Sequence, residues 1–284
     1  MRPFEYFSPQ SLGDACKFLA EHKSDSKILA GGTDVLIELR RSNGGTSSAI
    51  VDISRISSLR GITETSDSVV IGSLTTHAEV QRSQGIRMYA PLLSVAVSSI
   101  GSPQIRNRGT IGGNIINAAA CADTVPPLIA LGAEVKLKSS TAERVVPLSE
   151  FFIRPYVTAV RQDEILVEIQ FPKLPANARS AFVKLGRRNA LAIARLSVAA
   201  VVIKDDSGVV QEARIVPGAA FPKWQRVTDA ENVLLGKVLS KELSAEAGKK
   251  VSEAMISITG RRWSTEYKEP VIAVLVRRAL EVCM

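Results

Sequence analysis

Hydrophobic residues in the first part of the chain change their spacing from one segment to the next. From Leu12 to Ala20 they recur three or four positions apart, which predicts a helix over 8–23 that buries one face. Ser8 is the expected cap of this helix, and Pro9 fits its first turn. Three further elements are expected: a strand at 27–30, a helix at 34–41 and, after a polar loop over 42–48, a strand at 49–53. Residues 1–56 thus predict a small lobe in which strands and helices alternate.

The pattern then shifts toward shorter apolar runs with a period of two. Strands at 61–65 and 69–74 flank the polar turn 66–68 and predict a hairpin. Thr76 is the expected cap of a following helix, and residues 89–99 predict a buried helix. Further strands are expected at 133–138, 144–147 and 164–171. These elements form a second lobe over about 57–175.

A segment with two prolines, residues 172–178, is the predicted domain boundary. Beyond it, three strands and then three helices are expected, at 180–186, 198–204, 209–216, 226–235, 240–258 and 270–282, with a hairpin turn over 205–208. The pattern predicts an α+β fold with domains at 1–175 and 176–284, the first made of the lobes 1–56 and 57–175.

Two pairs of adjacent glycines stand where the backbone is expected to bend. Gly31-Gly32 follows the strand at 27–30 and precedes Thr33-Asp34, and Gly112-Gly113 lies within the segment 110–114. Without Cβ atoms, such bends let main-chain N–H groups converge on an anion, and Asp34 as a helix cap would aim further N–H groups there. Each pair alone is more often an ordinary turn, and neither forms a Rossmann or P-loop motif. Together they suit a ligand with two phosphates.

Composition narrows the class of protein. A chain of 284 residues and 30.5 kDa, with 45% hydrophobic and 23% charged residues, is expected to form one large or two modest globular domains. Its net charge is +8, but the basic residues are spread in pairs without interleaved aromatic residues. This argues against nucleic-acid binding and favours docking patches for partner subunits. No segment approaches the roughly 20 apolar residues of a membrane span, and the start has no apolar signal segment, so a cytoplasmic location is expected.

The cysteines and histidines argue against a metal site in this chain. Cys16, Cys121 and Cys283 lie far apart with no CxxC pair, and the histidines are His22 and His77. Reduced thiols are expected, and we expect no metal ligands.

The two glycine segments carry a resemblance to a known family. Residues 30–34 and 104–114 resemble the two flavin-binding signatures of the FAD subunit of molybdenum hydroxylases, the family of xanthine dehydrogenase, carbon monoxide dehydrogenase and 4-hydroxybenzoyl-CoA reductase. Segments 71–77, 131–135, 164–166 and 230–236 extend the resemblance over nearly the whole chain. It implies a two-lobed, PCMH-like FAD-binding domain, then a C-terminal domain with a three-stranded antiparallel sheet and helices, with FAD in the cleft between domains.

The resemblance also implies which residues bind FAD. Carried over position by position, they are Leu29, Ala30, Gly31, Gly32, Thr33, Asp34, Val35, Leu36, Ile100, Thr110, Ile111, Gly112, Gly113, Asn114, Asp123, Leu166 and Lys184. The two glycine segments would wrap the pyrophosphate, and Asp123 would accept hydrogen bonds from ribityl hydroxyls unless it only caps a helix. Ile100 would pack on the cofactor, although core packing also explains an isoleucine. Leu166 would offer backbone contacts. Lys184 would reach phosphate or flavin oxygens, with a solvated strand lysine as the alternative.

What the resemblance implies for function is electron transfer without catalytic residues in this chain. A large partner subunit would hold the molybdenum cofactor and oxidise the substrate, a small subunit would carry two two-iron, two-sulfur clusters, and FAD would pass electrons to an external acceptor. The assembly expected is a dimer of heterotrimers. Thr33-Asp34 favours the branch of xanthine dehydrogenase or of the aromatic hydroxylases and reductases, and Cys121 without nearby cysteines argues against a cluster in this chain. A stand-alone FAD-dependent oxidoreductase of the wider two-lobed superfamily is the alternative, although its catalytic acid or covalent flavin link has no strong candidate here.

Overall fold

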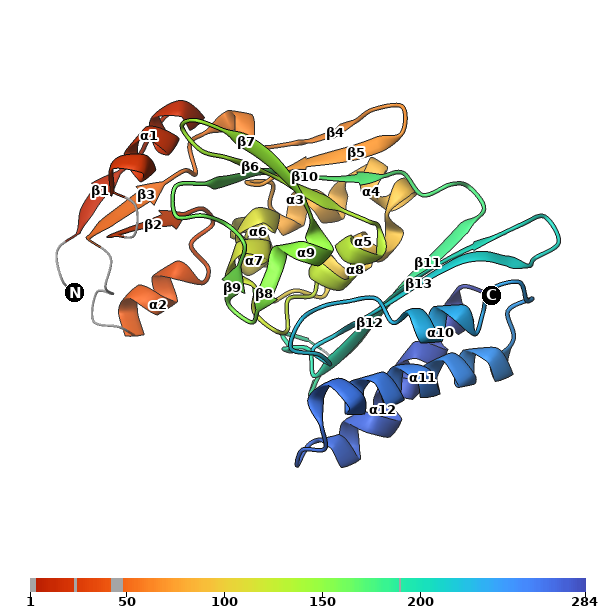
Figure 1. Cartoon of the computed structure of the whole chain (residues 1–284). Coiled ribbons are helices and arrows are strands. Elements are labelled where there is room, and N and C mark those ends of the chain that lie inside the picture. Colours follow the sequence, from red (N-terminus) through yellow and green to blue (C-terminus); the bar gives the residue numbers. More distant parts are fainter. Residues whose placement is uncertain (1–3, 23–24, 42–47, 189) are drawn as a thin grey trace.

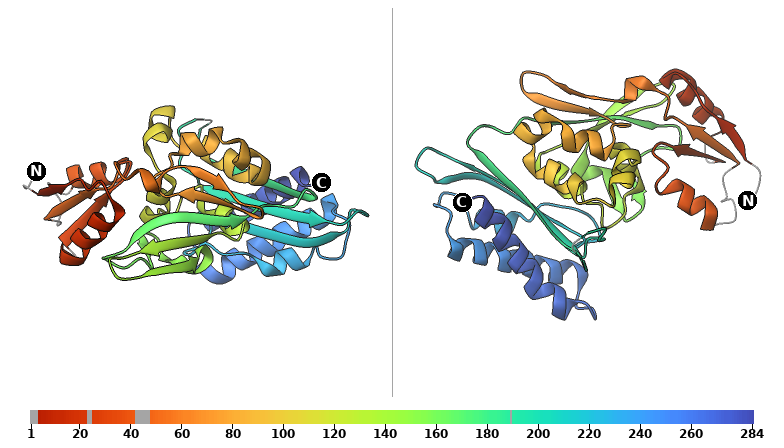
Figure 2. Two further views of the ribbon diagram at one scale, coloured as in Figure 1. Left: turned by 90° about the horizontal axis from the view of Figure 1, so that it is seen from above. Right: turned by 180° about the vertical axis from the view of Figure 1, so that it is seen from behind.

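The computed structural model describes residues 4–22, 25–41, 48–188 and 190–284. The N-terminal lobe lies at one end of the molecule and the C-terminal helices lie at the other, with the second lobe between them (Figures 1 and 2). The predicted polar loop at 42–48 falls, except for its last residue, outside the described residues. No helix in the described part of the chain is both long and apolar enough to cross a membrane.

The N-terminal lobe is built on a small parallel sheet in the order β1-β3-β2. Its elements are β1 (Glu5–Phe7), α1 (Leu12–His22), β2 (Ser26–Leu29), α2 (Val35–Arg41) and β3 (Ala49–Asp52). The alternation of strands and helices agrees with the sequence pattern, but the predicted start of the first helix is wrong. Ser11 Oγ accepts the N–H of Asp14 at 3.1 Å, so Ser11 and not Ser8 occupies the capping position.

The second lobe is a five-stranded antiparallel sheet with helices on one face. The strands run in the order β4-β5-β10-β6-β7. They are β4 (Ile62–Glu64), β5 (Ser68–Gly72), β6 (Glu134–Lys138), β7 (Glu143–Pro147) and β10 (Ile165–Pro172). The helices are α3 (His77–Arg82), α4 (Gln84–Tyr89), α5 (Pro91–Ser98), α6 (Pro103–Arg108), α7 (Ile111–Asn117), α8 (Val125–Ala130) and α9 (Leu148–Phe151), and the short strands β8 (Phe152–Arg154) and β9 (Val157–Thr158) form a separate hairpin.

Two local predictions in this lobe are confirmed. β4 and β5 pair around the turn 65–67, with Ile62 opposite Ile71. Thr76 caps α3 in a reciprocal arrangement with Glu79: each side chain bonds the other's backbone N–H.

The C-terminal part has the predicted three-stranded antiparallel sheet backed by helices. Its elements are β11 (Ala178–Leu185), β12 (Leu196–Lys204), β13 (Val210–Gly218), α10 (Thr228–Asn232), α11 (Lys241–Thr259) and α12 (Thr265–Val282). The last helix starts five residues before the predicted Pro270, which it accommodates internally. Thr265 secures this earlier start because its hydroxyl accepts the N–H of Arg262 at 2.7 Å.

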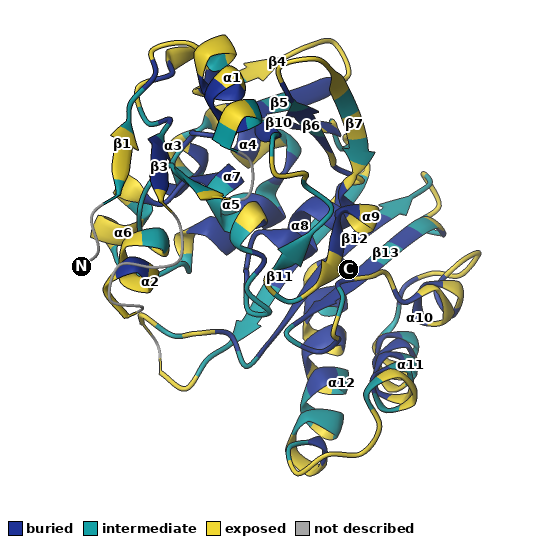
Figure 3. Cartoon of the chain, turned by 60° about the vertical axis from the view of Figure 1, so that its left-hand side comes forward, coloured by how far each residue is buried: buried dark blue, intermediate teal, exposed yellow. Residues whose placement is uncertain are grey.

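The elements stack in alternating layers, and β12 is the strand that lies between two cores (Figure 3). Ala199 and Val201 face the helices of the second lobe, while Val198, Ala200 and Val202 face α10–α12. Because both faces of the strand are covered, its sequence is a continuous apolar run and not an alternating one. The second-lobe helices are thereby held between two sheets, which fixes the loops at their ends.

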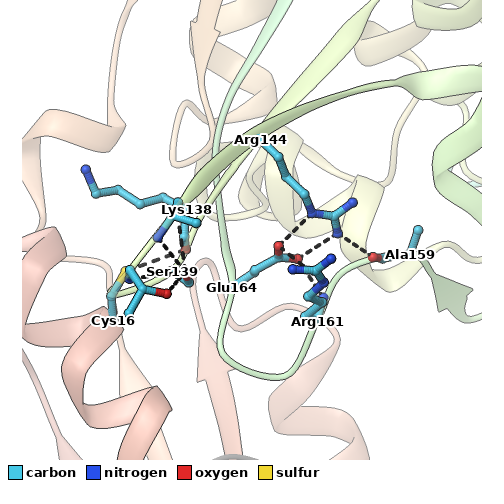
Figure 4. Close-up of polar contacts among 9 residues, drawn as sticks. Cys16, Lys138, Ser139, Arg144, Ala159, Arg161 and Glu164 are labelled. Carbon is cyan, nitrogen blue, oxygen red and sulfur yellow. Dashed lines mark hydrogen bonds and ion pairs between the residues drawn. The ribbon is translucent and has the colours of Figure 1, made fainter.

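A buried ion pair fixes the loop that enters β10. The side chain of Glu164 is 5% exposed and receives Arg144 Nε at 2.6 Å and Nη2 at 2.8 Å (Figure 4). The backbone N–H of Arg161 adds a third bond at 2.7 Å. Burial alone would raise the pKa of Glu164, but these bonds from Arg144 and Arg161 outweigh it and lower the pKa. The carboxylate is therefore ionised at neutral pH.

Arg144→Met is expected to lower the free energy of unfolding by about 3 kcal/mol at pH 7, because it leaves a buried carboxylate without its counter-charge. The loss should shrink as the pH falls below the ordinary pKa of a glutamate, since Glu164 contributes stability only while ionised. Urea unfolding at several pH values measures both effects.

Arg161→Met is the matched control. Its guanidinium is 69% exposed and stands 4.0 Å from Glu164 Oε1, whereas its bonding N–H belongs to the backbone. We expect a loss below about 1 kcal/mol. Equal losses in the two variants would contradict the role given to Arg144.

Candidate functional site

The first glycine bend leaves a row of main-chain donors unused. β2 ends at Leu29 and α2 begins at Val35, so residues 30–34 form the connection between them. Among the described residues, the N–H groups of Gly31, Gly32, Thr33 and Asp34 donate to no backbone or side-chain acceptor. Gly32 adopts φ +77°, a left-handed conformation that glycine reaches without strain. Residues 31–33 are half-buried and Asp34 is exposed.

The second glycine segment differs from the predicted open bend. Thr110 caps α7, and Gly112 and Gly113 lie in the first turn of that helix. The N–H of Ile111 donates to Thr75 O, that of Gly112 to Ser73 O and that of Gly113 to Thr110 Oγ1. The expectation that these N–H groups are available to an anion is therefore wrong in this structure. The segment acts as a wall that is itself fixed to β5 and its turn.

The two segments nevertheless meet, as the sequence predicts. A Cβ atom built on Gly31 would lie 2.0 Å from the carbonyl oxygen of Arg108 and 3.1 Å from Cα of Gly109. Gly31 is therefore required by close packing of main chain on main chain. A Cβ on Gly112 would likewise lie 2.6 Å from Cβ of Ser73. Glycine at position 31 therefore lets the N-terminal lobe pack against the second lobe, whereas glycine at position 112 lets α7 pack on Ser73 within the second lobe.

A cavity of about 130 Å³ opens between the lobes at this contact. It is lined by Ala30, Gly31, Ser54, Arg60, Leu74, Thr76, Asn107, Arg108 and Thr110. Within the described ranges, neither Arg60 nor Arg108 forms an ion pair with a carboxylate. Both arginines are exposed, and Arg60 Nη2 donates to Ser54 O at 3.1 Å. Two arginines without a carboxylate partner, on a cavity that Gly31 also lines, favour an anion with several oxygens. The cavity is smaller than the roughly 300 Å³ of a typical ligand site, so it fits a phosphate group and not a whole nucleotide.

Sequence reasoning missed several residues of this cavity. Arg108 lies inside the second signature, and a basic residue directly before Gly109-Thr110 was a usable signal for an anion site. Arg60 and Ser54 carried no such signal. They enter the cavity because the connection between the lobes passes beside it, which is a property of the tertiary fold.

Asp123 and Lys184 form a buried pair across the two domains. Lys184, on β11, places Nζ 2.6 Å from Asp123 Oδ2 and 3.1 Å from Ser99 O. The side chain of Asp123 is 7% exposed and that of Lys184 is 11% exposed. The alternative that Lys184 is a solvated lysine on a strand is therefore wrong. Burial raises the pKa of Asp123 to about 6, although Lys184 opposes this rise. Asp123 Oδ1 is buried and has no hydrogen-bond partner among the described residues.

Three further residues that the sequence predicts to bind the cofactor, Ile100, Asn114 and Leu166, have different environments. Ile100 is half-buried and packs on the core of the second lobe, and its carbonyl accepts Arg106 Nη1 at 2.9 Å. Asn114 Oδ1 accepts the hydroxyl of Thr124, directly after Asp123, at 2.6 Å. Leu166 is 4% exposed with its side chain in the core, beside a register shift of β10. Neither Ile100 nor Leu166 lines the cavity.

The first glycine segment also contains side chains that point outward. Leu29 and Val35 are half-buried, Leu36 is 46% exposed and Asp34 is exposed. The Asp34 carboxylate has a single weak contact in the described structure, Thr33 Oγ1 at 3.5 Å. Asp34 and Asp123 both act on Cys121, whose pKa is raised by burial and then by these two carboxylates.

Family models cover the chain in two parts. One described as the FAD binding domain in molybdopterin dehydrogenase matches residues 2–174. Another described as the CO dehydrogenase flavoprotein C-terminal domain matches residues 180–282.

Relatives and a solved structure match over nearly the full length. The alpha subunit of the 6-hydroxypseudooxynicotine dehydrogenase complex of Paenarthrobacter nicotinovorans is 34% identical over 283 residues, 99% of this chain and 95% of the relative. The xanthine dehydrogenase FAD-binding subunit of Escherichia coli O157:H7 is 34% identical over 277 residues, 97% and 94% of the two chains. A structure of carbon monoxide dehydrogenase from Hydrogenophaga pseudoflava, in a form lacking the Mo-pyranopterin moiety, is similar at a TM-score of 0.90 and 34% identity, with 99% and 97% covered.

Gly31→Ala is expected to destabilise the protein by about 1–3 kcal/mol, because its Cβ would overlap the main chain of Arg108 and force the lobes apart. Gly13→Ala in α1 is the matched control: its nearest neighbour would be Ser11 Oγ at 3.8 Å, so a loss of stability is not expected. Thermal unfolding of both variants measures the difference. Unchanged stability of Gly31→Ala would contradict the close approach of the two segments.

Proposed function

The chain belongs to the family of FAD-binding subunits of molybdenum hydroxylases, and we propose that it carries electrons within such a complex. It would receive them from iron–sulfur clusters on a partner subunit and deliver them to an external acceptor. The observation that carries the proposal is the cavity between the lobes, which is lined by Gly31, whose N–H has no acceptor among the described residues, and by two arginines without a carboxylate partner. This is the environment that a dinucleotide's diphosphate requires.

The residues of the site fit FAD on two independent observations. The first is the set of N–H groups at 31–34 that have no acceptor among the described residues. The second is Asp123 Oδ1, a buried acceptor without a donor. A diphosphate would satisfy the N–H groups and a ribityl hydroxyl would satisfy the carboxylate oxygen. A buried polar group without a partner costs about 1–3 kcal/mol, so a ribityl hydroxyl that donates to Asp123 Oδ1 would remove that cost.

Each predicted residue takes a role within this proposal. The backbone of Leu29–Leu36 would hold the diphosphate, with the Thr33 hydroxyl as an added donor and Arg60 and Arg108 balancing its charge. Thr110–Asn114 would form the opposite wall, to which Thr110 would contribute its hydroxyl, since the N–H groups of residues 111–114 donate within the protein. Ile100 would pack on the flavin nucleotide, and Leu166 would support the wall from β10. Asp123 and Lys184 would lie near the ribityl chain.

Bound FAD would supply both one- and two-electron redox chemistry, which suits a position between single-electron carriers and a two-electron acceptor. The chain's own contribution is to bind and orient the cofactor. The relatives include a complex subunit, and the solved structure is of a molybdenum enzyme, so a large molybdenum subunit and a small iron–sulfur subunit are the partners proposed. A dimer of heterotrimers in the cytoplasm is part of the same proposal, as are the domains 1–175 and 176–284.

The complex purified with its partners is expected to show a flavin absorption spectrum and to release FAD on denaturation, about one per copy of this chain. The isolated chain loaded with FAD should remain oxidised when mixed with a hydroxylase substrate in a stopped-flow instrument, because substrate oxidation belongs to the partner. A complex without flavin would end the proposal. Rapid reduction of the isolated chain would instead favour a stand-alone oxidoreductase.

Arg108→Met is expected to weaken FAD binding about tenfold or more while changing riboflavin binding little, because riboflavin lacks the diphosphate. Raising the salt concentration should reduce the difference between variant and wild type. Arg82→Met, an exposed arginine at the end of α3 outside the cavity, is the control. Isothermal titration measures each affinity. Equal losses for FAD and riboflavin would contradict a diphosphate at the cavity.

A further inference from the structure

The lysine on β11 is already occupied by protein groups. Nζ of Lys184 lies 2.6 Å from Asp123 Oδ2 and 3.1 Å from Ser99 O, and its side chain is 11% exposed. An ammonium group has three donors, so two of them are used inside the protein. Both partners belong to the second lobe: Ser99 follows α5, and Asp123 precedes α8. The lysine thus joins the C-terminal sheet to two loops of the FAD-binding domain.

Only one of the two carboxylate oxygens of Asp123 has a hydrogen-bond partner among the described residues. Asp123 Oδ2 receives the lysine, whereas Oδ1 is buried and has no partner in the described part of the chain. The ion pair restrains the carboxyl group through Oδ2, and Oδ1 keeps an acceptor capacity that no described residue uses. Thr124, the residue after Asp123, donates its hydroxyl to Asn114 Oδ1 at 2.6 Å, which links the loop of Asp123 to the proposed second wall of the FAD site.

We propose that Lys184 is a positioning residue that acts on FAD through Asp123: it holds the carboxylate ionised and oriented so that Oδ1 accepts a hydrogen bond from a hydroxyl of the ribityl chain. This inference rests on the proposed function. It changes the role that the sequence suggested for Lys184, which was direct contact with phosphate or flavin oxygens. The lysine instead sets the charge and direction of the group that makes the contact.

A second consequence is coupling between the two domains. Because one ion pair serves both the cofactor contact and the contact between β11 and the second lobe, FAD binding and docking of the C-terminal sheet should strengthen each other reciprocally. Ile100, which would pack on the cofactor, directly follows Ser99 and is thereby held by the same lysine.

The pH dependence follows from the burial of the pair. Burial raises the pKa of Asp123 to about 6 even with Lys184 beside it. Removing the lysine removes the opposing effect, so the pKa should rise further and the carboxyl should take up a proton at a higher pH. The other titratable groups nearby are Cys121 and, beyond it, Asp34; burial raises the pKa of the Cys121 thiol, which keeps it neutral at pH 7.

The test is FAD affinity as a function of pH, from 5 to 8.5, measured by fluorescence titration of the full chain in its complex after FAD has been removed. Wild type should bind more weakly as the pH falls through about 6. Lys184→Met should bind about tenfold or more weakly at pH 7.5, with its midpoint shifted to higher pH. Lys184→Arg should restore most of the affinity and the original midpoint. Asp123→Asn should bind weakly with no midpoint in this range.

Lys204→Met is the matched control, since this lysine of the same sheet donates to Cys283 O and Met284 O and faces no carboxylate of the site. It should keep the wild-type affinity and midpoint. Wild-type affinity in Lys184→Met would overturn the inference. So would a loss that is equal at every pH with an unmoved midpoint, because direct contact with the cofactor or a general structural role predicts that result. Failure of wild type itself to bind FAD would instead refute the proposed function.

Discussion

The main chain of Gly31 lies against the carbonyl of Arg108 so closely that no Cβ atom fits between them. This contact joins two segments that are remote in sequence and belong to different lobes. It places Gly31, whose N–H has no acceptor among the described residues, on one cavity with Arg108 and Arg60, which form no ion pair with a carboxylate in the described part of the chain. The cavity is thus a consequence of packing, because without this contact Gly31 and the two arginines would not line the same space.

The rest of the fold keeps this contact in place. The second-lobe helices lie between two sheets, and the bonds from Ile111 and Gly112 to Thr75 and Ser73 fix the wall to β5 and its turn. Three ion pairs on buried carboxylates hold neighbouring segments together: Arg144 with Glu164 before β10, Arg226 with Glu231 at 2.8 Å in the C-terminal domain, and Lys184 with Asp123 between the domains. A buried carboxylate that loses its cationic partner destabilises the fold, so these ion pairs favour the one arrangement of the loops in which both partners meet.

The sequence predicted the order of the elements and the meeting of the glycine segments, because strand periodicity and paired glycines are local signals. It failed where tertiary contacts decide. The sequence predicts a bend at Gly112-Gly113, but in the structure this pair lies in the first turn of α7. Its N–H groups donate to Ser73 O and to the capping hydroxyl of Thr110, and the neighbouring N–H of Ile111 donates to Thr75 O. Arg60 reaches the cavity only through the path of the chain between the lobes. Lys184 could be placed near the cofactor from the family resemblance, but its partners Asp123 and Ser99 come from elements that only the fold brings together.

The central claim is that main-chain donors of the first glycine bend, and not those of the second, hold the diphosphate of FAD. The most direct measurement is the change in amide resonances of the full chain labelled with ¹⁵N-glycine, with and without FAD. The account predicts that the signals of Gly31 and Gly32 move and become protected from exchange with solvent, while those of Gly112 and Gly113 stay close to their original positions. Bound FAD that leaves Gly31 and Gly32 unchanged, or that shifts mainly Gly112 and Gly113, would contradict it.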